Sequence, residues 1–198
     1  MLDRIAVDQM TRLDKLLLRL EAQRACLSWA IGEIAGLPGI VFELGLGHGR
    51  TYDHLRKHLP DRGIYVFDRE VGCIADCTPP DDRLVLGDIA DTLPLAARRF
   101  RGKVVLTHAD MGTYDDAENL VRATVLSRNL PALLAPGAVV LSDLPLQLDG
   151  ATPLPLPAGA RQGRYFIYRT GRTSDFRIRS LAAPSRQPRN GASSRPFR

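Results

Sequence analysis

A glycine-rich segment at residues 41–51, with the sequence VFELGLGHGRT, carries the clearest chemical signal in the chain. An apolar run leads into three alternating glycines and then into residues that favour a helix. Glycine lets the backbone turn tightly and lets a ligand approach the main chain closely. The first turn of the following helix presents unpaired N–H groups, which suit an anionic group. The segment therefore predicts a strand, a turn and a helix that together hold a small ligand.

Two acidic residues indicate what kind of ligand this turn would hold. The glycines follow a G-x-G-x-G spacing, and Arg50 takes the place of the third glycine of the dinucleotide pattern G-x-G-x-x-G. Glu43 lies two residues before the first glycine, where its charge would repel a pyrophosphate but favour a cationic ligand. Asp68 ends the next apolar run, about 20 residues downstream, where a carboxylate binds ribose hydroxyls. We therefore expect a cationic, ribose-containing ligand rather than NAD.

Apolar runs that alternate with helical patterns define the elements that must position these residues. Residues 10–35 repeat leucine and isoleucine at helical spacing and predict a long helix. Five apolar runs predict strands, at 40–44, 63–67, 83–86, 103–107 and 138–142, and helices are predicted at 51–58, 70–77 and 117–134. This alternation predicts an α/β fold, a mostly parallel sheet with helices on both faces.

The C-terminal part of the chain departs from this alternation. Residues 149–163 are rich in Pro, Gly and Ala and predict a loop, so no helix is expected between Asp143 and Arg164. Residues 164–169 predict one more strand, which we expect at the edge of the sheet. The predicted organisation is an N-terminal helical cap at 1–39, an α/β domain at 40–170 and a basic, disordered tail at 171–198.

Three segments of the predicted domain resemble one known family. The stretch ELGLGHGRT resembles the first motif of class I S-adenosylmethionine (SAM)-dependent methyltransferases. VFD, which ends at Asp68, is similar to their acidic second-strand motif, and LGD, which ends at Asp88, is similar to the motif beside the adenine. The resemblance covers about residues 40–145 and implies a Rossmann-like fold, SAM as the cofactor and methyl transfer as the reaction. The helix-rich stretch QRACLSWAIGEI before the first motif suggests a small bacterial subgroup.

The resemblance also implies which residues meet the cofactor. The backbone of residues 45–49 would meet the methionine part, with Glu43 beneath the turn. Asp68 would accept both ribose hydroxyls, and Asp88 and the N–H of Ile89 would contact the adenine. The implied cofactor-binding residues are Glu43, Gly45, Leu46, Gly47, Gly49, Thr51, Asp68, Asp88 and Ile89. Taken singly, Asp68 and Asp88 could instead be ordinary helix-capping acids.

The ends of the fourth and fifth predicted strands supply the catalytic candidates, because ligands of open α/β sheets bind there. Methyl transfer demands alignment and a dry site, and it needs a general base only if the nucleophile must lose a proton. His108 and Asp110 are the predicted catalytic residues, since histidine has the pKa for a base near neutrality. Tyr114 and Asp143 lie in the same region, and the alternative for His108 is a packed or surface histidine.

Departures from known motifs narrow the range of methyl acceptors. Residues 109–114 read ADMGTY, without the D-P-P-Y-type motif of families that methylate exocyclic or amide nitrogens. None of the three cysteines follows a proline, as the thiolate nucleophile of cytosine C5 methylation typically does. These observations argue against those classes and leave the acceptor open.

We expect no metal in the site. Asp110 and Asp143 could together hold Mg²⁺, somewhat as in catechol-type O-methyltransferases, but Leu144 stands where an Asn follows the second Asp there. Cys73 and Cys77 are four residues apart, and two ligands do not make a zinc site, so we expect them in the core.

Charge is distributed unevenly along the chain. The 198 residues carry a formal net charge of +5, but residues 161–198 hold ten arginines and one acid and carry +9, so residues 1–160 carry −4. The acidic body and the lack of a second domain favour a small-molecule acceptor over nucleic acid. Two alternatives stay open: a nucleic-acid methyltransferase that uses the arginine-rich tail, and a SAM-binding module without catalysis.

Composition also bears on location and partners. No apolar run approaches the roughly 18 residues of a membrane helix, and the chain starts without the apolar region of a secretory signal. The three cysteines, an odd and small number, fit a reduced compartment. We therefore expect a cytoplasmic protein without a membrane partner, and the N-terminal helix is compatible with a homo-oligomer.

Overall fold

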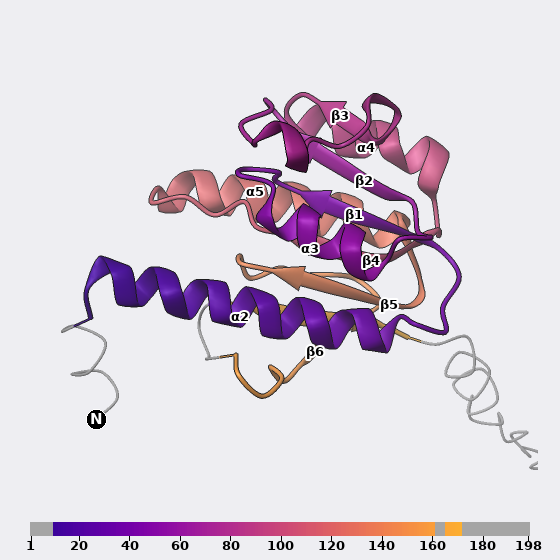
Figure 1. Ribbon diagram of the computed structural model, residues 1–198. Coiled ribbons are helices and arrows are strands. Elements are labelled where there is room, and N and C mark those ends of the chain that lie inside the picture. The colour runs from indigo at the N-terminus through magenta and orange to yellow at the C-terminus, as the bar shows by residue number, and fades with distance from the viewer. Residues whose placement is uncertain (1–9, 161–164, 172–198) are drawn as a thin grey trace, which may run out of the picture.

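The computed structural model describes residues 10–160 and 165–171 of the protein (Figure 1). The predictions for residues 1–9 of the helical cap, for 161–164 and for the basic tail from residue 172 onward lie outside the described residues. Within the described ranges, no helix has both the length and the apolar character needed to cross a membrane.

Within the described residues, seven strands form one sheet in the order β3-β2-β1-β4-β5-β7-β6 (Figure 1). The strands are β1 (Ile40–Leu44), β2 (Ile64–Asp68), β3 (Leu84–Leu86), β4 (Val104–Ala109), β5 (Leu134–Ser142), β6 (Ala151–Leu154) and β7 (Phe166–Thr170). The first five pair in parallel, and β7 lies antiparallel between β5 and β6. The predicted α/β fold with a mostly parallel sheet is confirmed.

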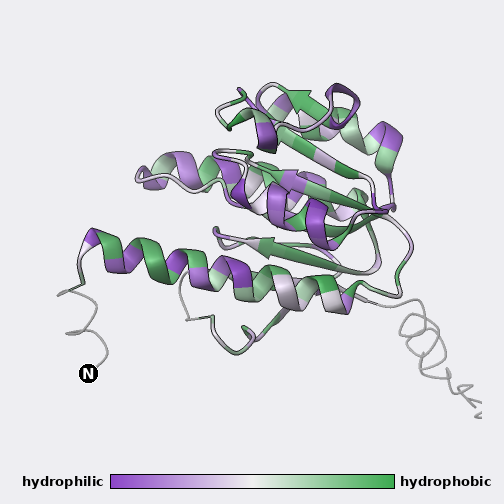
Figure 2. Cartoon of the chain, in the orientation of Figure 1, coloured by the Kyte–Doolittle hydropathy of each residue, from purple (hydrophilic) through white to green (hydrophobic). Residues whose placement is uncertain are grey.

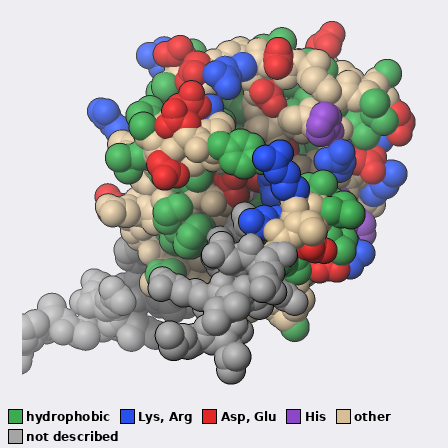
Figure 3. All heavy atoms as spheres, turned by 90° about the vertical axis from the view of Figure 1, so that its left-hand side faces the viewer, with side chains coloured by type: hydrophobic (Ala, Val, Ile, Leu, Met, Phe, Trp, Pro, Cys, Tyr) green, Lys and Arg blue, Asp and Glu red, His purple; other side chains and the backbone are tan. Residues whose placement is uncertain are grey.

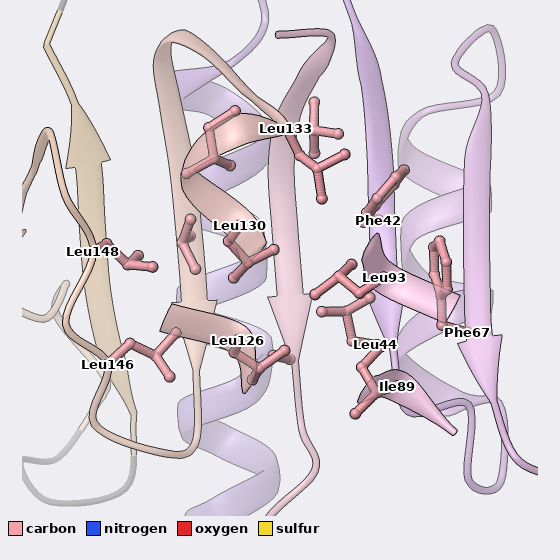
Figure 4. Packing of buried hydrophobic residues seen from close by; sticks show 14 of the residues in the cluster. Phe42, Leu44, Phe67, Ile89, Leu93, Leu126, Leu130, Leu133, Leu146 and Leu148 are labelled. Carbon is pink, nitrogen blue, oxygen red and sulfur yellow. The ribbon is translucent and has the colours of Figure 1, made fainter. Parts of the chain in front are cut away.

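Helices cover both faces of the sheet, because its strands bury side chains on both sides. They are α2 (Arg12–Glu33), α3 (Arg50–His58), α4 (Ile89–Phe100) and α5 (Asp116–Asn129). Successive strand residues point to opposite faces, so β1 places Val41 in the core under α2 and α3 and Phe42 in the core under α4 and α5 (Figure 4). The hydropathy of the strands, mostly green in Figure 2, reflects this burial on two sides.

Helix α2 confirms the helix predicted at 10–35, and its first half reaches past the sheet (Figure 1). Thr11 and Asp14 form a capping box at its start, which satisfies two N–H groups that would otherwise lack partners. The second half packs on the sheet, whereas Leu13, Leu16 and Leu17 in the first half are 73%, 46% and 55% exposed.

The structure corrects two predictions about the strands. The predicted loop at 149–163 contains the short strand β6, and the prediction failed because it rested on prolines such as Pro153. Proline cannot donate to a sheet ladder and is confined to positions such as an edge strand, which β6 is. The strand predicted at the sheet edge is β7, which instead lies inside the sheet. In residues 143–160 the structure has no helix, as predicted.

The helices differ from the predictions in three places. Helix α4 was not predicted; Pro94 lies inside it and interrupts the helical signal. The helix predicted at 70–77 is reduced to a 3₁₀ turn at Ala75–Cys77, since Gly72 and the following prolines leave few helix-forming residues. The helix predicted at 117–134 ends at Asn129, and a 3₁₀ turn that contains Pro131 follows it.

Candidate functional site

The carboxyl ends of β1, β2 and β4 border a cleft of about 640 Å³ at the point where the strand order reverses. Figure 3 looks onto this edge of the sheet, where acidic and basic side chains stand close together. The predicted site residues that line the cleft are Gly45, Gly47, Asp68, Asp88, Ile89 and Asp110. The other predicted residues lie around or beneath it.

The glycine-rich turn forms one wall of the cleft. The turn has φ angles of +93° at Gly45, +48° at Gly47 and +76° at Gly49, in a region that residues with side chains rarely adopt. A Cβ atom on Gly45 would lie 2.8 Å from the carbonyl oxygen of Asp110, and one on Gly49 would lie 2.6 Å from the Cβ of Cys77. A Cβ on Gly47 would meet nothing within 4 Å, so Gly47 is the glycine whose missing side chain leaves the cleft open.

Asp68, at the end of β2, shapes this turn as well as lining the cleft. Its Oδ2 accepts hydrogen bonds from the N–H groups of Leu46 at 2.7 Å and Gly47 at 3.1 Å. Its Oδ1 accepts one from the N–H of Arg69 at 2.6 Å. The carboxylate therefore ties the second strand to the glycine turn, and its predicted ribose contact would add to this role.

Asp88 and Ile89 lie where helix α4 begins. The Oδ1 of Asp88 accepts a hydrogen bond from the N–H of Ala90 at 2.9 Å and caps the helix. Asp88 therefore caps a helix, which was the alternative role considered for it from the sequence. It also lines the cleft, together with Ile89. The predicted adenine contacts stay a prediction.

Glu43 lies beneath the turn, as expected, and is completely buried. Its Oε1 accepts a hydrogen bond from the hydroxyl of Thr51, and its Oε2 lies 2.8 Å from Nδ1 of His108. The Nε2 of His108 lies 3.1 Å from the hydroxyl oxygen of Tyr165. Burial opposes protonation of His108, but the charge and hydrogen bond of Glu43, together with the charges of Asp110 and Asp143, outweigh it and raise the pKa of His108 above its usual range.

This arrangement corrects the prediction that His108 is a base in the cleft. The imidazole has no exposed surface, and both of its nitrogens already face polar partners. It points to the face of the sheet covered by α2 and α3, so it is the packed histidine that was the alternative reading. Glu43 and Thr51 likewise act from below the turn rather than in the cleft.

Asp110 is the acidic side chain of the cleft that follows β4. Its Oδ2 accepts hydrogen bonds from Nη2 of Arg19 at 2.6 Å and from Nε2 of Gln23 at 2.5 Å. Its Oδ1 is buried and has no hydrogen-bond partner among the described residues. No local sequence signal marks Arg19 as part of the site, because 91 residues separate it from Asp110.

Asp143, at the end of β5, shapes the loop that carries Asp110. Its two oxygens accept hydrogen bonds from the N–H groups of Met111 at 3.0 Å and Gly112 at 2.7 Å. Burial and the negative charge of Asp110 raise the pKa of Asp143 to about 6. Tyr114, the remaining candidate of this region, is fully exposed.

Potential metal ligands cluster outside the lining of the cleft. In the part of the chain that the structure describes, the one group of three is Asp53, Asp76 and Cys77. Asp53 is already paired with two basic side chains of its own helix. At Asp110 and Asp143, the prediction that no metal binds stays a prediction.

Comparison with known proteins decides the family. The sequence profile of a family described as S-adenosyl-L-methionine methyltransferase matches residues 10–170. The chain belongs to this methyltransferase family. A crystal structure of an S-adenosyl-L-methionine methyl transferase from Silicibacter pomeroyi DSS-3 is 47% identical, with a TM-score of 0.78 over 82% of this chain and 100% of that one. No curated protein sequence matches the chain.

More distant structures share the fold alone. TrmN from Thermus thermophilus is 19% identical to this methyltransferase, with a TM-score of 0.50 over 75% of this chain and 48% of that one. At this level of identity, the likeness says that the sheet and helices are arranged alike and carries nothing about the acceptor.

The cleft of the methyltransferase fits SAM, the cofactor of its family. Gly47 leaves the cleft open beside the main chain, which suits the close approach of a ligand. Asp110 lines the cleft, and its carboxylate offers a negative charge to a cationic group. Two further acids, Asp68 and Asp88, lie along the same cleft at the ends of β2 and β3.

Replacing Asp68 with alanine is expected to weaken cofactor binding by about 1–3 kcal/mol. The substitution removes the predicted ribose contact and also frees the N–H groups of Leu46 and Gly47. Isothermal titration with S-adenosylhomocysteine (SAH), the demethylated product of SAM, measures the change. Asp91, an exposed acid in the first turn of α4 that does not line the cleft, gives the matched control Asp91→Ala. An unchanged affinity of Asp68→Ala would move the ribose elsewhere.

Proposed function

We propose that this methyltransferase holds SAM with its methionine end near Asp110 and the glycine turn, and transfers the methyl group to a small molecule. The observation that carries the proposal is the carboxylate of Asp110, which lines the cleft and whose Oδ1 has no hydrogen-bond partner among the described residues. A buried carboxylate oxygen without a partner is costly, so it favours a ligand that brings a positive charge. SAM carries two such groups, an ammonium and a sulfonium.

The remaining contacts follow from the places of the residues in the cleft. The backbone of Gly45 and Gly47 would support the methionine part, and Asp68 would hold the ribose. The adenine would lie near Asp88 and Ile89, beside the apolar side chains that α5 contributes to the cleft. When bound, SAM supplies the electrophilic methyl group, and the chain contributes alignment and the exclusion of water.

Asp110 is the residue of this site that could take a proton from an acceptor. It lines the cleft, whereas His108 is sealed beneath it. Burial and the negative charge of the neighbouring Asp110 make Asp143 easier to protonate than an isolated aspartate. An acceptor whose nucleophile carries a proton would therefore use Asp110, and an acceptor without one would need only alignment.

The size and charge of the molecule support a small acceptor. A cleft of about 640 Å³ is in the range of small-molecule sites. Residues 1–160 carry a net charge of −4, which disfavours nucleic acid as the acceptor. The second candidate is a nucleic-acid methyltransferase that uses the ten arginines of residues 161–198. A SAM-binding module without turnover is the third.

We also propose the organisation, location and assembly of the chain. Residues 1–39 form a helical cap, 40–170 the SAM-binding domain and 171–198 a basic tail. The three cysteines are all free, which favours the cytoplasm. The exposed leucines of α2 favour association between copies of the chain. We propose no membrane partner.

Titration of the full chain with SAH, with NAD as the control, tests the cofactor part of the proposal. Micromolar binding of SAH and none of NAD is the expected result. Conversion of SAM to SAH that occurs with small nucleophiles, but not with RNA or DNA, would then support a small acceptor. Turnover on nucleic acid alone would favour the second candidate, and binding without turnover on any acceptor would favour the third.

A further inference from the structure

Four polar side chains, three of them buried, form a continuous hydrogen-bonded chain beneath the cleft. Thr51 lies in the first turn of α3, just after the glycine turn, and its hydroxyl donates to Glu43 on β1. Glu43 faces His108 on β4 at 2.8 Å, and His108 faces the hydroxyl of Tyr165, just before β7, at 3.1 Å. The exposed fractions of Glu43, His108 and Tyr165 are 0%, 0% and 2%, and none of the three lines the cleft.

The chain continues back to the cleft on the other side. The Tyr165 hydroxyl lies beside the side chain of Gln23, a residue of α2 that is itself buried. The amide of Gln23 donates to Oδ2 of Asp110 at 2.5 Å. This chain of side chains thus runs from the glycine turn to Asp110, which form two walls of the cleft.

The register of the sheet explains why these groups meet. Glu43 and His108 are directly paired residues of the neighbouring strands β1 and β4. They point to the same face, where the surrounding core is apolar and includes Val41 and Leu106. The rings of His108 and Tyr165 are nearly parallel, with 6° between their planes and 5.9 Å between their centres. A buried polar set of this kind is costly unless each member is satisfied, so its geometry is tightly constrained.

We propose that Tyr165 and His108 are positioning residues that couple the glycine turn to Asp110 and thereby hold the two walls of the cofactor cleft in register. The inference rests on the proposed function of the cleft. Neither residue touches the cofactor. Each acts through a neighbour: His108 through Glu43 and Thr51, and Tyr165 through Gln23.

A double-mutant cycle on SAH affinity tests the coupling, because Thr51 lies at the end of the hydrogen-bonded chain beside the glycine turn and Tyr165 lies three side chains further along it. Tyr165→Phe removes one hydroxyl and Thr51→Val removes the other, and each is expected to weaken SAH binding about fivefold, the effect of one net hydrogen bond. If the hydrogen-bonded chain couples the two residues, the SAH affinity of the double variant falls about five- to tenfold in total. Independent sites would multiply to about 25-fold.

Two further variants separate positioning from a general loss of packing. Tyr52→Phe makes the same chemical change at another buried tyrosine of the same core, outside the chain, and should leave SAH affinity unchanged. Thr51→Ser keeps the hydroxyl and loses only a methyl group, so it should keep wild-type affinity where Thr51→Val does not. Thermal unfolding of each variant shows that it is folded at the titration temperature.

The outcomes distinguish this inference from the function on which it rests. Wild-type protein that fails to bind SAH overturns the proposed function. Wild-type protein that binds SAH, together with a Tyr165→Phe variant of equal affinity or a 25-fold double variant, overturns the coupling alone. If Thr51→Val does not fold, the ¹⁵N signals of the His108 ring decide: they must change in Tyr165→Phe and stay constant in Tyr52→Phe.

Discussion

Replacing Gly47 with valine is expected to weaken SAH binding about a hundredfold or more, roughly 2.7 kcal/mol or greater, while the protein still folds. A side chain at Gly47 would meet no protein atom within 4 Å, so it would project into open space. Gly47 lines the cleft, and that open space is where a ligand would approach the main chain. The substitution would therefore exclude the ligand by occupying its volume.

The backbone of Gly47 requires a matched control, because its φ of +48° is unfavourable for any side chain. Such a conformation costs about 1–2 kcal/mol in an ordinary residue. Gly102, in the turn between α4 and β4, has a φ of +66° and equally open surroundings, and it does not line the cleft. Gly102→Val should show a similar fall in melting temperature with normal SAH affinity. If Gly47→Val also binds SAH normally, the glycine turn does not hold the cofactor.

Replacing Asp110 with asparagine should weaken the binding of SAM about 30-fold, roughly 2 kcal/mol, the range for a hydrogen bond to a charged group. The amide keeps the shape of the side chain and an oxygen that can accept from Arg19 and Gln23. It removes the negative charge that the unpaired Oδ1 would offer to the cofactor. Titration with SAM and SAH measures the change, and turnover falls further if Asp110 also takes a proton.

The position of α2 must be separated from this charge effect. Arg19→Met removes the outer partner of Asp110 and loosens the contact between α2 and the cleft, but it leaves the carboxylate in place. Arg19 is 44% exposed, so its ion pair contributes only about 0–1 kcal/mol. We expect Arg19→Met to change SAM affinity by less than about fivefold. Equal losses in the two variants would show that Asp110 acts by holding α2 rather than by binding the cofactor.

The local parts of the site could be predicted from the sequence alone. The turn at Gly45, Gly47 and Gly49, between a strand and a helix, depends on neighbouring residues, and the structure gives all three glycines the positive φ that the pattern implies. Asp68 and Asp88 follow apolar runs, and parallel strands bring such ends to one edge of the sheet, so both line the cleft. Glycine conformation and strand ends are determined over a few residues, which is why a sequence pattern reveals them.

Contacts between distant segments were decided only by the tertiary structure. Whether His108 faces the cleft or the core depends on the pairing of β4 with β1, and a shift of one residue in that register would turn it to the other face. The hydrogen bonds from Arg19 and Gln23 to Asp110 depend on where α2 crosses the sheet edge. The place of β7 inside the sheet depends on which open strand edge it finds. These features follow from packing between segments far apart in the chain, which no local pattern of residue types records.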